Sequence, residues 1–266
     1  MRTAVLLLFY VGIILCLIPG LLFAAGLGLR ETLLRIGKWA MGASRAVLGL
    51  RVDVSGRIPE PEDGPFVYMS NHVSLLDGPL LFRLIRGPVR VIMKTSLFRI
   101  PVVGLAMKIV GFIPVDRSGT RSGRAAIGRA AEAIKEKGYS FLIFPEGTRS
   151  LDGRLQALRR GGFFLAREAG VPVAPVSIEG TFEIMPKGRF VPGKGPIRVF
   201  FHPPVADPEP ESSDFEAWMS AVRERVRARE PRLATCLRVE SMAASLDQES
   251  LVVESTWWRP SDRARR

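Results

Sequence analysis

A histidine and an aspartate, His72 and Asp77, form the first pair of side chains in the sequence that could do acid–base chemistry. On one continuous helix they would point about 140° apart, too far to touch. Ser74-Leu75-Leu76-Asp77 has a capping-box pattern, which predicts that the helix begins at Ser74. His72 then lies in the preceding loop and can fold back onto the Asp77 carboxylate, which leaves its other ring nitrogen free as a general base. The alternative is that Asp77 only caps the helix and His72 is an ordinary loop residue.

Basic side chains follow two of the predicted strands. Residues 111–117 end in an Asp-Arg pair, and residues 144–150, Phe-Pro-Glu-Gly-Thr-Arg-Ser, follow another strand with a tight turn. Arg117 and Arg149, together with Lys94, would form a phosphate cradle, because a guanidinium group offers paired donors to phosphate oxygens. The alternatives are a solvated ion pair in the first segment and a plain β-turn in the second.

Other kinds of catalytic site are not indicated. Ser74 is assigned to helix capping, and no Gly-x-Ser-x-Gly sequence occurs. The chain has two cysteines and two histidines, too few for a disulfide framework, a Cys-based zinc site or a multi-His centre. No Walker-type glycine loop precedes a helix. We therefore expect neither a metal ion nor a bound cofactor.

Short apolar runs alternate with helical stretches from residue 65 onward. The runs with strand character are residues 65–69, 89–93, 112–115, 141–144, 173–178 and 197–201. Helices are predicted at 123–137, 160–169 and 214–229. The alternation predicts an α/β fold with a mixed, largely buried sheet flanked by helices. Pro114 and Pro175 predict edges or bulges in their strands.

The N-terminal region is predicted to bind a membrane. No charged residue occurs from Thr3 to Leu29, a run longer than the roughly 20 residues that span a bilayer core. Pro19-Gly20 interrupts it, so a re-entrant or in-plane helical pair is as plausible as a single span. The mixed basic and apolar residues that follow suit an interfacial helix, and their charge predicts that the rest is cytosolic. A cleaved signal peptide and an ordinary surface helix are the alternatives.

These patterns divide the chain into four parts. Residues 1–54 form membrane-anchoring helices, and residues 55–64 a linker rich in Pro and Glu. Residues 65–233 form the α/β domain, and residues 234–266 a C-terminal tail to which no function is assigned.

The charge balance points to anionic partners. The chain has 38 Lys+Arg against 26 Asp+Glu, a formal net charge of +12, which suits nucleic acid, acidic lipid headgroups or a phosphorylated substrate. Nucleic acid is the least favoured of these, because the cations are not interleaved with aromatic residues or arranged in a known motif. An anionic membrane is expected instead.

Four segments, in this order, resemble the motifs of the glycerolipid acyltransferase superfamily, and especially its 1-acyl-sn-glycerol-3-phosphate acyltransferase branch. They are Asn71-His72 with Asp77, Gly111 through Arg117, Phe144 through Ser150, and Val171 through Val176. The resemblance extends from about Pro65 to Pro203. It implies that His72 deprotonates the acceptor hydroxyl, that Asp77 orients His72, and that Arg117 and Arg149 hold the glycerol phosphate. It also implies substrate-binding positions at Asn71, Lys94, Glu146, Gly147 and Thr148.

The activity implied by the resemblance is transfer of a fatty acyl group to the sn-2 hydroxyl of 1-acylglycerol 3-phosphate. The co-substrate would be acyl-CoA or acyl carrier protein, with no other cofactor, and the catalytic domain would lie on the cytosolic face of the cell membrane. Pro114 stands where the family commonly has a larger apolar residue, which bears on the acceptor headgroup. The alternatives are another lysolipid acceptor (a lyso-ornithine lipid or a headgroup-bearing lysophospholipid) and a non-catalytic, basic, membrane-anchored binding protein.

Overall fold

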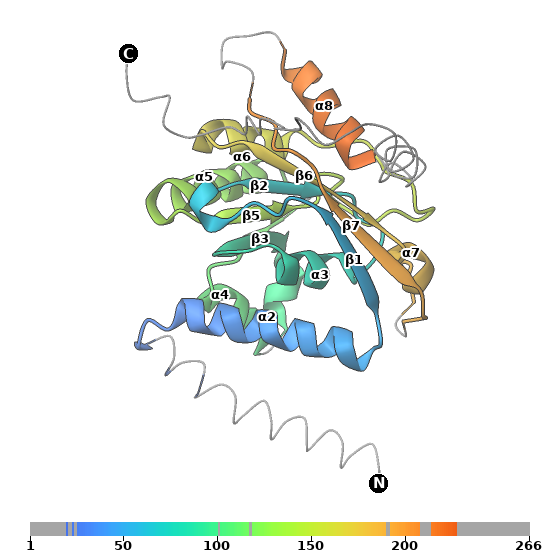
Figure 1. The fold of residues 1–266 in the computed structure, drawn as a ribbon. Helices are drawn as coiled ribbons and strands as arrows, with labels where there is room; N and C mark the ends of the chain where they lie inside the picture. The colour runs from blue at the N-terminus through green and yellow to red at the C-terminus, as the bar shows by residue number, and fades with distance from the viewer. Residues whose placement is uncertain are drawn as a thin grey trace, which may run out of the picture.

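A computed structural model describes residues 20, 23, 26–100, 102–116, 119–189, 192–207 and 214–227. Their strands form one sheet in the order β1-β7-β6-β2-β5-β3-β4 (Figure 1). The strands are β1 (Arg51–Gly56), β2 (Val67–Ser70), β3 (Val89–Lys94), β4 (Ile113–Val115), β5 (Ser140–Ile143), β6 (Val173–Glu179) and β7 (Pro196–Phe201). Neighbours are parallel except β6 and β7, which are antiparallel. The predicted α/β class and mixed sheet are confirmed.

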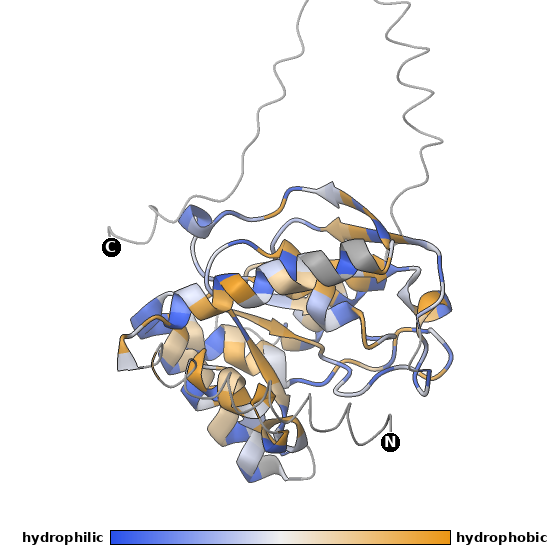
Figure 2. Ribbon diagram, turned by 90° about the horizontal axis from the view of Figure 1, so that it is seen from below, coloured by the Kyte–Doolittle hydropathy of each residue, from blue (hydrophilic) through white to orange (hydrophobic). Residues whose placement is uncertain are grey.

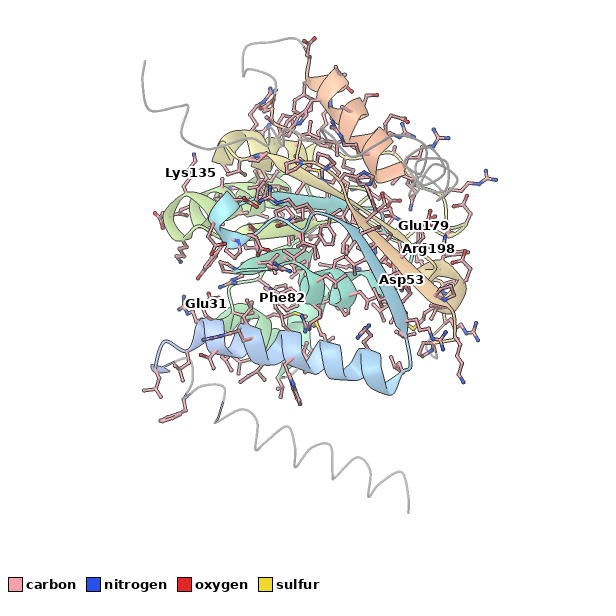
Figure 3. The ribbon with its side chains drawn as sticks, in the orientation of Figure 1. Glu31, Asp53, Phe82, Lys135, Glu179 and Arg198 are labelled. Atoms are coloured by element: carbon pink, nitrogen blue, oxygen red, sulfur yellow. The ribbon has the colours of Figure 1, made fainter. Side chains whose placement is uncertain are left out.

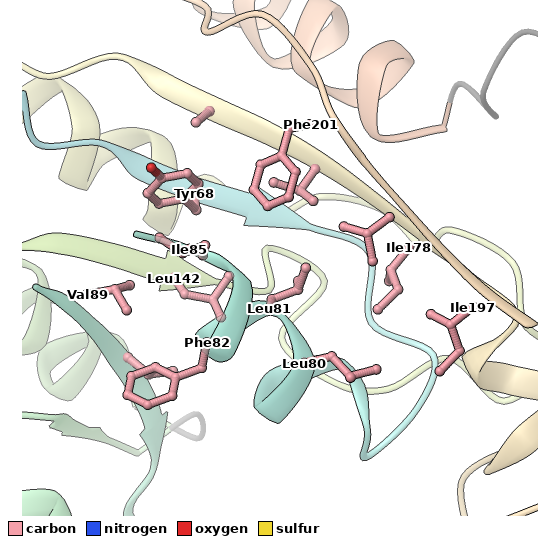
Figure 4. Packing of buried hydrophobic residues seen from close by; sticks show 14 of the residues in the cluster. Tyr68, Leu80, Leu81, Phe82, Ile85, Val89, Leu142, Ile178, Ile197 and Phe201 are labelled. Atoms are coloured by element: carbon pink, nitrogen blue, oxygen red, sulfur yellow. The ribbon is translucent and has the colours of Figure 1, made fainter. Parts of the chain in front are cut away.

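Helices cover both faces of this sheet (Figure 1). They are α2 (Arg30–Val47), α3 (Asp77–Leu84), α4 (Val103–Ile109), α5 (Thr120–Lys137), α6 (Gly161–Ala169), α7 (Thr181–Ile184) and α8 (Phe215–Arg227), with 3-10 turns η1 (Pro61–Asp63) and η2 (Thr95–Arg99). The central strand β2 is buried on both faces because its side chains alternate between two cores. Tyr68 packs with Leu81 of α3 (Figure 4), whereas Val67 and Met69 pack with Phe163 of α6.

Each of the two prolines lies in a strand with a parallel neighbour, Pro114 opposite Met93 and Pro175 opposite Met69. Pro114 is in β4, the edge strand, as predicted. Pro175 is in the interior strand β6, between the isolated bridge from Val173 to Val205 and the ladder with β7 that begins at Val176. A ring without an N–H is therefore placed where no ladder hydrogen bond is required of it.

The predicted boundary of the α/β domain needs a correction, because the sheet begins at residue 51 and not at residue 65. β1 pairs with β7 from Arg51–Pro196 to Gly56–Phe201. It is an edge strand and mostly exposed, so Arg51-Val52-Asp53-Val54 lacks the continuous apolar run that identified the other strands. Residues 51–56 therefore belong to the α/β domain.

Helix α2 lies across the outside of the molecule (Figures 1 and 2). Leu34 is buried in the core beneath it, whereas Ile36 and Trp39 are 55% and 72% exposed. This two-sided character matches the amphipathic helix predicted here. Among the residues that the structure describes, no helix combines the length and apolar character needed to cross a bilayer. Most of residues 3–29, and the whole tail 234–266, lie outside the described residues.

Candidate active site

The imidazole of His72 meets the carboxylate of Asp77 where β2 gives way to α3. The Nδ1 atom of His72 is 3.0 Å from Oδ2 of Asp77, so the predicted fold-back of the histidine is confirmed. Helix α3 begins at Asp77, however, and not at Ser74. The predicted capping contacts form in part: the Ser74 hydroxyl accepts from the N–H of Leu76 at 3.2 Å, and the Asp77 carboxylate accepts from the N–H of Ser74 at 2.7 Å. The Ser74 hydroxyl also donates to the carbonyl of Met185 at 2.7 Å.

The Asp77 carboxylate is fully buried and surrounded by donors. Its Oδ2 accepts hydrogen bonds from the main-chain N–H groups of Val73 and Ser74, at 2.8 and 2.7 Å, in addition to facing His72. Its Oδ1 accepts one from the hydroxyl of Thr181, at 2.6 Å. The N-terminal end of α3 adds a favourable dipole for a negative charge. Asp77 is thus fixed in one orientation toward the imidazole.

The main chain of His72 is held at both of its polar groups by the segment 144–150. Its N–H donates to Oε1 of Glu146 at 2.6 Å, and its carbonyl accepts from the N–H of Ser150 at 2.8 Å. The other carboxylate oxygen of Glu146 accepts from the N–H of Gln156 at 2.9 Å. Burial raises the pKa of the Glu146 carboxyl, and the N–H groups of Gln156 and His72 act in the opposite direction. Glu146 therefore connects the histidine loop to the segment that leads into α6.

The ring of His72 is also constrained by an aromatic neighbour. The rings of His72 and Phe144 are stacked, with centroids 4.0 Å apart and planes 18° from parallel. The His72 side chain is 16% exposed, and Nε2 makes no hydrogen bond to any residue that the structure describes. Stacking, the Asp77 contact and the main-chain bonds together direct Nε2 away from the protein's own acceptors. This is the geometry of a base that can receive a proton from a bound molecule.

Two residues predicted to bind substrate have hydrogen-bond partners within the chain. The side-chain amide of Asn71 donates to the carbonyl of Ile178 at 2.8 Å and accepts from its N–H at 2.9 Å. Glu146 is 3% exposed and uses both oxygens on main-chain donors. Because buried polar groups are paired, these in-chain hydrogen bonds give both side chains a structural role, and their contact with a substrate stays a prediction. They position the loop that carries His72.

The other described residues that were predicted to bind substrate lie at the end of the sheet where β2, β5 and β3 finish. These strands are parallel neighbours, so Lys94 and the segment after β5 lie at the same edge as His72. Lys94 and Thr148 are exposed. Arg149 is half-buried and makes no ion pair or hydrogen bond to another described residue. Arg117 lies outside the described residues, and its predicted role stays a prediction.

Gly147 has a backbone requirement of its own. Its φ is +74°, and a Cβ atom placed there would lie 2.9 Å from Nε of Arg159. A glycine is needed because an L side chain is disfavoured at this φ and would collide with the arginine. Gly147 thus shapes the turn that presents Arg149.

Thr181 and Phe144 carry site contacts that were not assigned to them from the sequence. Phe144 lies within the recognised segment 144–150, but nothing in the sequence shows that its ring faces His72. Thr181 follows the carboxyl end of β6, the kind of position where α/β proteins place site residues. That rule alone could have singled it out.

No metal site accompanies these side chains. Within the described part of the chain, no group of three or more His, Cys, Asp or Glu residues is arranged to hold a metal ion.

The second histidine, His202, is buried and pairs with the Ser177 hydroxyl at 2.7 Å through Nε2. Ser177 contacts main-chain carbonyls of α8, including that of Val226, so His202 lies on the face of the sheet that this helix covers.

A comparison with protein families matches the part of the chain that holds this site. The model of the family described as Acyltransferase matches residues 51–179, from β1 through β6. The chain therefore contains a domain that matches the acyltransferase family. The match includes the loop of His72 and the segment 144–150, and its start at residue 51 agrees with the corrected boundary of the domain.

Relatives of the acyltransferase domain carry one recurring name. The chain is 42% identical over 157 residues to the chloroplastic 1-acyl-sn-glycerol-3-phosphate acyltransferase BAT2 of Brassica napus, covering 58% of this chain and 45% of that protein. It is 32% identical over 177 residues to 1-acyl-sn-glycerol-3-phosphate acyltransferase alpha of Homo sapiens, covering 66% and 62%. The chain thus spans less than half the length of the Brassica protein.

A solved structure shows the same arrangement. The crystal structure of the 1-acyl-sn-glycerophosphate (LPA) acyltransferase, PlsC, from Thermotoga maritima superimposes with a TM-score of 0.64 at 29% sequence identity. The match covers 84% of this chain and 90% of the Thermotoga chain. The resemblance seen in the sequence therefore extends to the three-dimensional fold.

Proposed function

We propose that this acyltransferase transfers a fatty acyl group from an acyl thioester to the free sn-2 hydroxyl of 1-acylglycerol 3-phosphate, giving phosphatidic acid. The observation that carries the proposal is the His72 ring, which is held by Asp77 at 3.0 Å while Nε2 has no described partner. The shared name of the relatives supports the choice of a lysophosphatidic acid acceptor.

In the proposed reaction, Nε2 of His72 takes the proton from the acceptor hydroxyl as that oxygen attacks the thioester carbonyl carbon. The new C–O bond forms, the carbonyl becomes a tetrahedral oxyanion, and its collapse breaks the C–S bond. The departing thiolate receives the proton back from the imidazolium, so the products are an ester and a free thiol. Asp77 stabilises the transient imidazolium and keeps the neutral ring protonated at Nδ1.

The acceptor phosphate is assigned to the basic side chains at the same edge of the sheet. Arg149 has no partner among the described residues, and Lys94 is exposed at the end of β3. Together with Arg117 they would bind the phosphate and bring the hydroxyl to His72, which turns a random encounter into an oriented one. Guanidinium groups suit this role because they donate two parallel hydrogen bonds to phosphate oxygens.

The donor is proposed to be acyl-CoA or acyl carrier protein, because both are anionic and the chain has a formal net charge of +12. The reaction needs no further cofactor and no metal ion in any of its steps. The lipid acceptor requires a site at a membrane, which we propose is the cytosolic face of the cell membrane. The exposed Ile36 and Trp39 of α2 support interfacial binding.

The test supplies membranes containing the protein with labelled acyl-CoA or acyl carrier protein and a panel of lysolipids. We expect phosphatidic acid from lysophosphatidic acid, and loss of this product in His72→Ala. His202→Gln is the matched control, because it removes the other of the two histidines on a different face of the sheet. Equal turnover by His72→Ala would eliminate the base, and turnover with other lysolipids only would replace the proposed acceptor.

A further inference from the structure

A basic cavity lies at the end of the sheet opposite to the end that carries His72. Its volume is about 870 Å³, and it opens between α2, the end of α3 and the starts of β3 and β5. Its cationic lining residues are Arg35, Lys38, Arg83, Arg86 and Lys137. The loop of His72 follows the carboxyl end of β2, whereas this cavity adjoins the amino ends of the parallel strands β3 and β5. The two places are therefore separated by the length of the strands.

The carboxylates near the cavity do not neutralise it. Glu31, the acidic lining residue, lies on the side of α2 that faces the sheet (Figure 3) and pairs with the fully buried Arg90. Arg86 pairs with Glu60. Arg35, Arg83 and Lys137 have no carboxylate partner in the part of the chain that the structure describes. The wall thus keeps an excess of positive charge.

Lys38 is the most constrained of these cations. Its ammonium group donates to the carbonyls of Ile85 and Gly87, at 2.6 and 2.9 Å, which leaves one of its three protons for another acceptor. Burial, followed by the charges of Arg83 and Arg90, lowers the pKa of Lys38 to about 8. A bound anion would offset both the burial and the repulsion, and hold the lysine in its charged form.

We infer that this cavity binds a phosphate group. The guanidinium and ammonium groups of this lining come from α2, α3, the end of α5 and the loop before β3. Together they match the several acceptor oxygens of a phosphate better than the two of a carboxylate. The phosphate could belong to a membrane lipid headgroup, because the outer face of α2 beside the cavity exposes Ile36 and Trp39, or it could be a free phosphate. The site does not depend on the proposed catalytic function.

The first experiment measures inorganic phosphate binding to the full chain in detergent, by calorimetry against sodium chloride of equal ionic strength. All proteins carry Arg149→Gln, which removes the phosphate contact proposed near His72. Relative to that parent, Arg35→Gln with Arg83→Gln should weaken binding about tenfold or more, since each removes charge-assisted hydrogen bonds. Arg124→Gln with Lys135→Gln, which makes the same charge change on exposed positions of α5, should leave it unchanged (Lys135 is labelled in Figure 3).

The second experiment separates the two sources of phosphate by flotation with vesicles of phosphatidylcholine, with or without phosphatidylglycerol. A lipid site predicts that Arg35→Gln with Arg83→Gln reduces binding to the phosphatidylglycerol vesicles severalfold more than the α5 control does, and that inorganic phosphate competes. A free-phosphate site predicts vesicle binding equal to the control. If the cavity variant and the α5 control have the same phosphate affinity and the same vesicle binding, the inference is wrong.

Discussion

The main-chain N–H of His72, after β2, donates a 2.6 Å hydrogen bond to Oε1 of Glu146, after β5. These two strands are neighbours in the sheet, although β3 and β4 lie between them in the sequence. The glutamate therefore holds the histidine through its backbone. Ser150 completes the restraint by donating to the His72 carbonyl at 2.8 Å. The segment 144–150 is thus a support for the proposed base, as well as the source of Arg149.

Glu146→Gln tests this positioning role. The amide oxygen can replace only one carboxylate oxygen, so its NH₂ group must face the N–H of His72 or of Gln156. An unpaired buried donor costs about 1–3 kcal/mol. We expect lower thermal stability and a kcat reduced about tenfold, with the KM for lysophosphatidic acid nearly unchanged. A large rise in that KM alone would instead show that Glu146 contacts the acceptor.

Thr181→Val tests the hydroxyl that holds Asp77. The substitution keeps the shape of the side chain but removes the 2.6 Å hydrogen bond to Oδ1 of Asp77. One oxygen of a fully buried carboxylate then lacks its donor, which costs about 1–3 kcal/mol, shared between folding and transition-state stabilisation. We expect kcat to fall while acceptor KM changes little. Thr181→Ser should restore the rate, and failure of this rescue would contradict the assignment.

Gly147→Ala tests the turn before Arg149. The variant combines a φ of +74° with a Cβ 2.9 Å from Nε of Arg159, and we expect destabilisation of about 1–3 kcal/mol. Gly138→Ala is the matched control, because its φ is +63° and nothing lies within 4 Å of the added atom. Thermal unfolding should show a larger loss for Gly147→Ala than for the control. Equal losses would mean that the arginine moves freely.

Arg149→Ala tests the proposed phosphate contact near His72. Loss of charge-assisted hydrogen bonds of about 1.5–3 kcal/mol predicts a 10- to 100-fold rise in the acceptor KM, with a smaller change in kcat. The control is Arg154→Ala, whose side chain is 88% exposed in the same connection and should leave both constants unchanged. Unaltered acceptor kinetics in Arg149→Ala would remove this residue from the cradle.

His202 gives a prediction for pH dependence. Burial, followed by the charge of Arg225, lowers the pKa of His202 from 6.5 to about 4 in the folded protein. Between about pH 6.5 and 4, His202 therefore binds a proton in the unfolded chain but not in the folded protein. This contribution to stability is therefore full above about pH 6.5 and lost as the pH falls toward 4, by about 3 kcal/mol in total.

Denaturant unfolding of the solubilised protein between pH 7.5 and 4.5 measures this effect. His202→Gln cannot bind the proton, so its unfolding free energy should fall less steeply with acidification than that of the unmodified protein. The difference between the two curves isolates His202 from the carboxyl groups, which titrate in both proteins. Parallel curves would contradict the assignment.

The elements of this fold with strong local signals were predictable. Continuous apolar runs identified the inner strands, and Pro114 marked an edge. β1 was missed because an edge strand buries little, and Val54 is 39% exposed. Helix α3 starts at Asp77, three residues later than the capping pattern predicts, although Ser74 and Asp77 do make capping hydrogen bonds.

The roles of individual polar residues were harder to predict than their proximity. The meeting of His72 with Asp77 follows from a short loop, so local reasoning sufficed. Asn71 finds its partner in Ile178, 107 residues away, and Glu146 finds His72 across 74. Nothing local in the sequence shows these long-range partners, which is why the structural role of the two side chains was not predicted.

The loop of His72 is restrained by the segment after β5 and by residues in and after β6. Of these two strands, β6 is synthesised last. Ile178 binds Asn71, and Thr181 binds Asp77. On the ribosome, a chain that has not yet passed Thr181 holds the histidine and the aspartate without the groups that align them. The proposed base therefore matures late in synthesis, so an unfinished chain already touching lipid would not yet modify it.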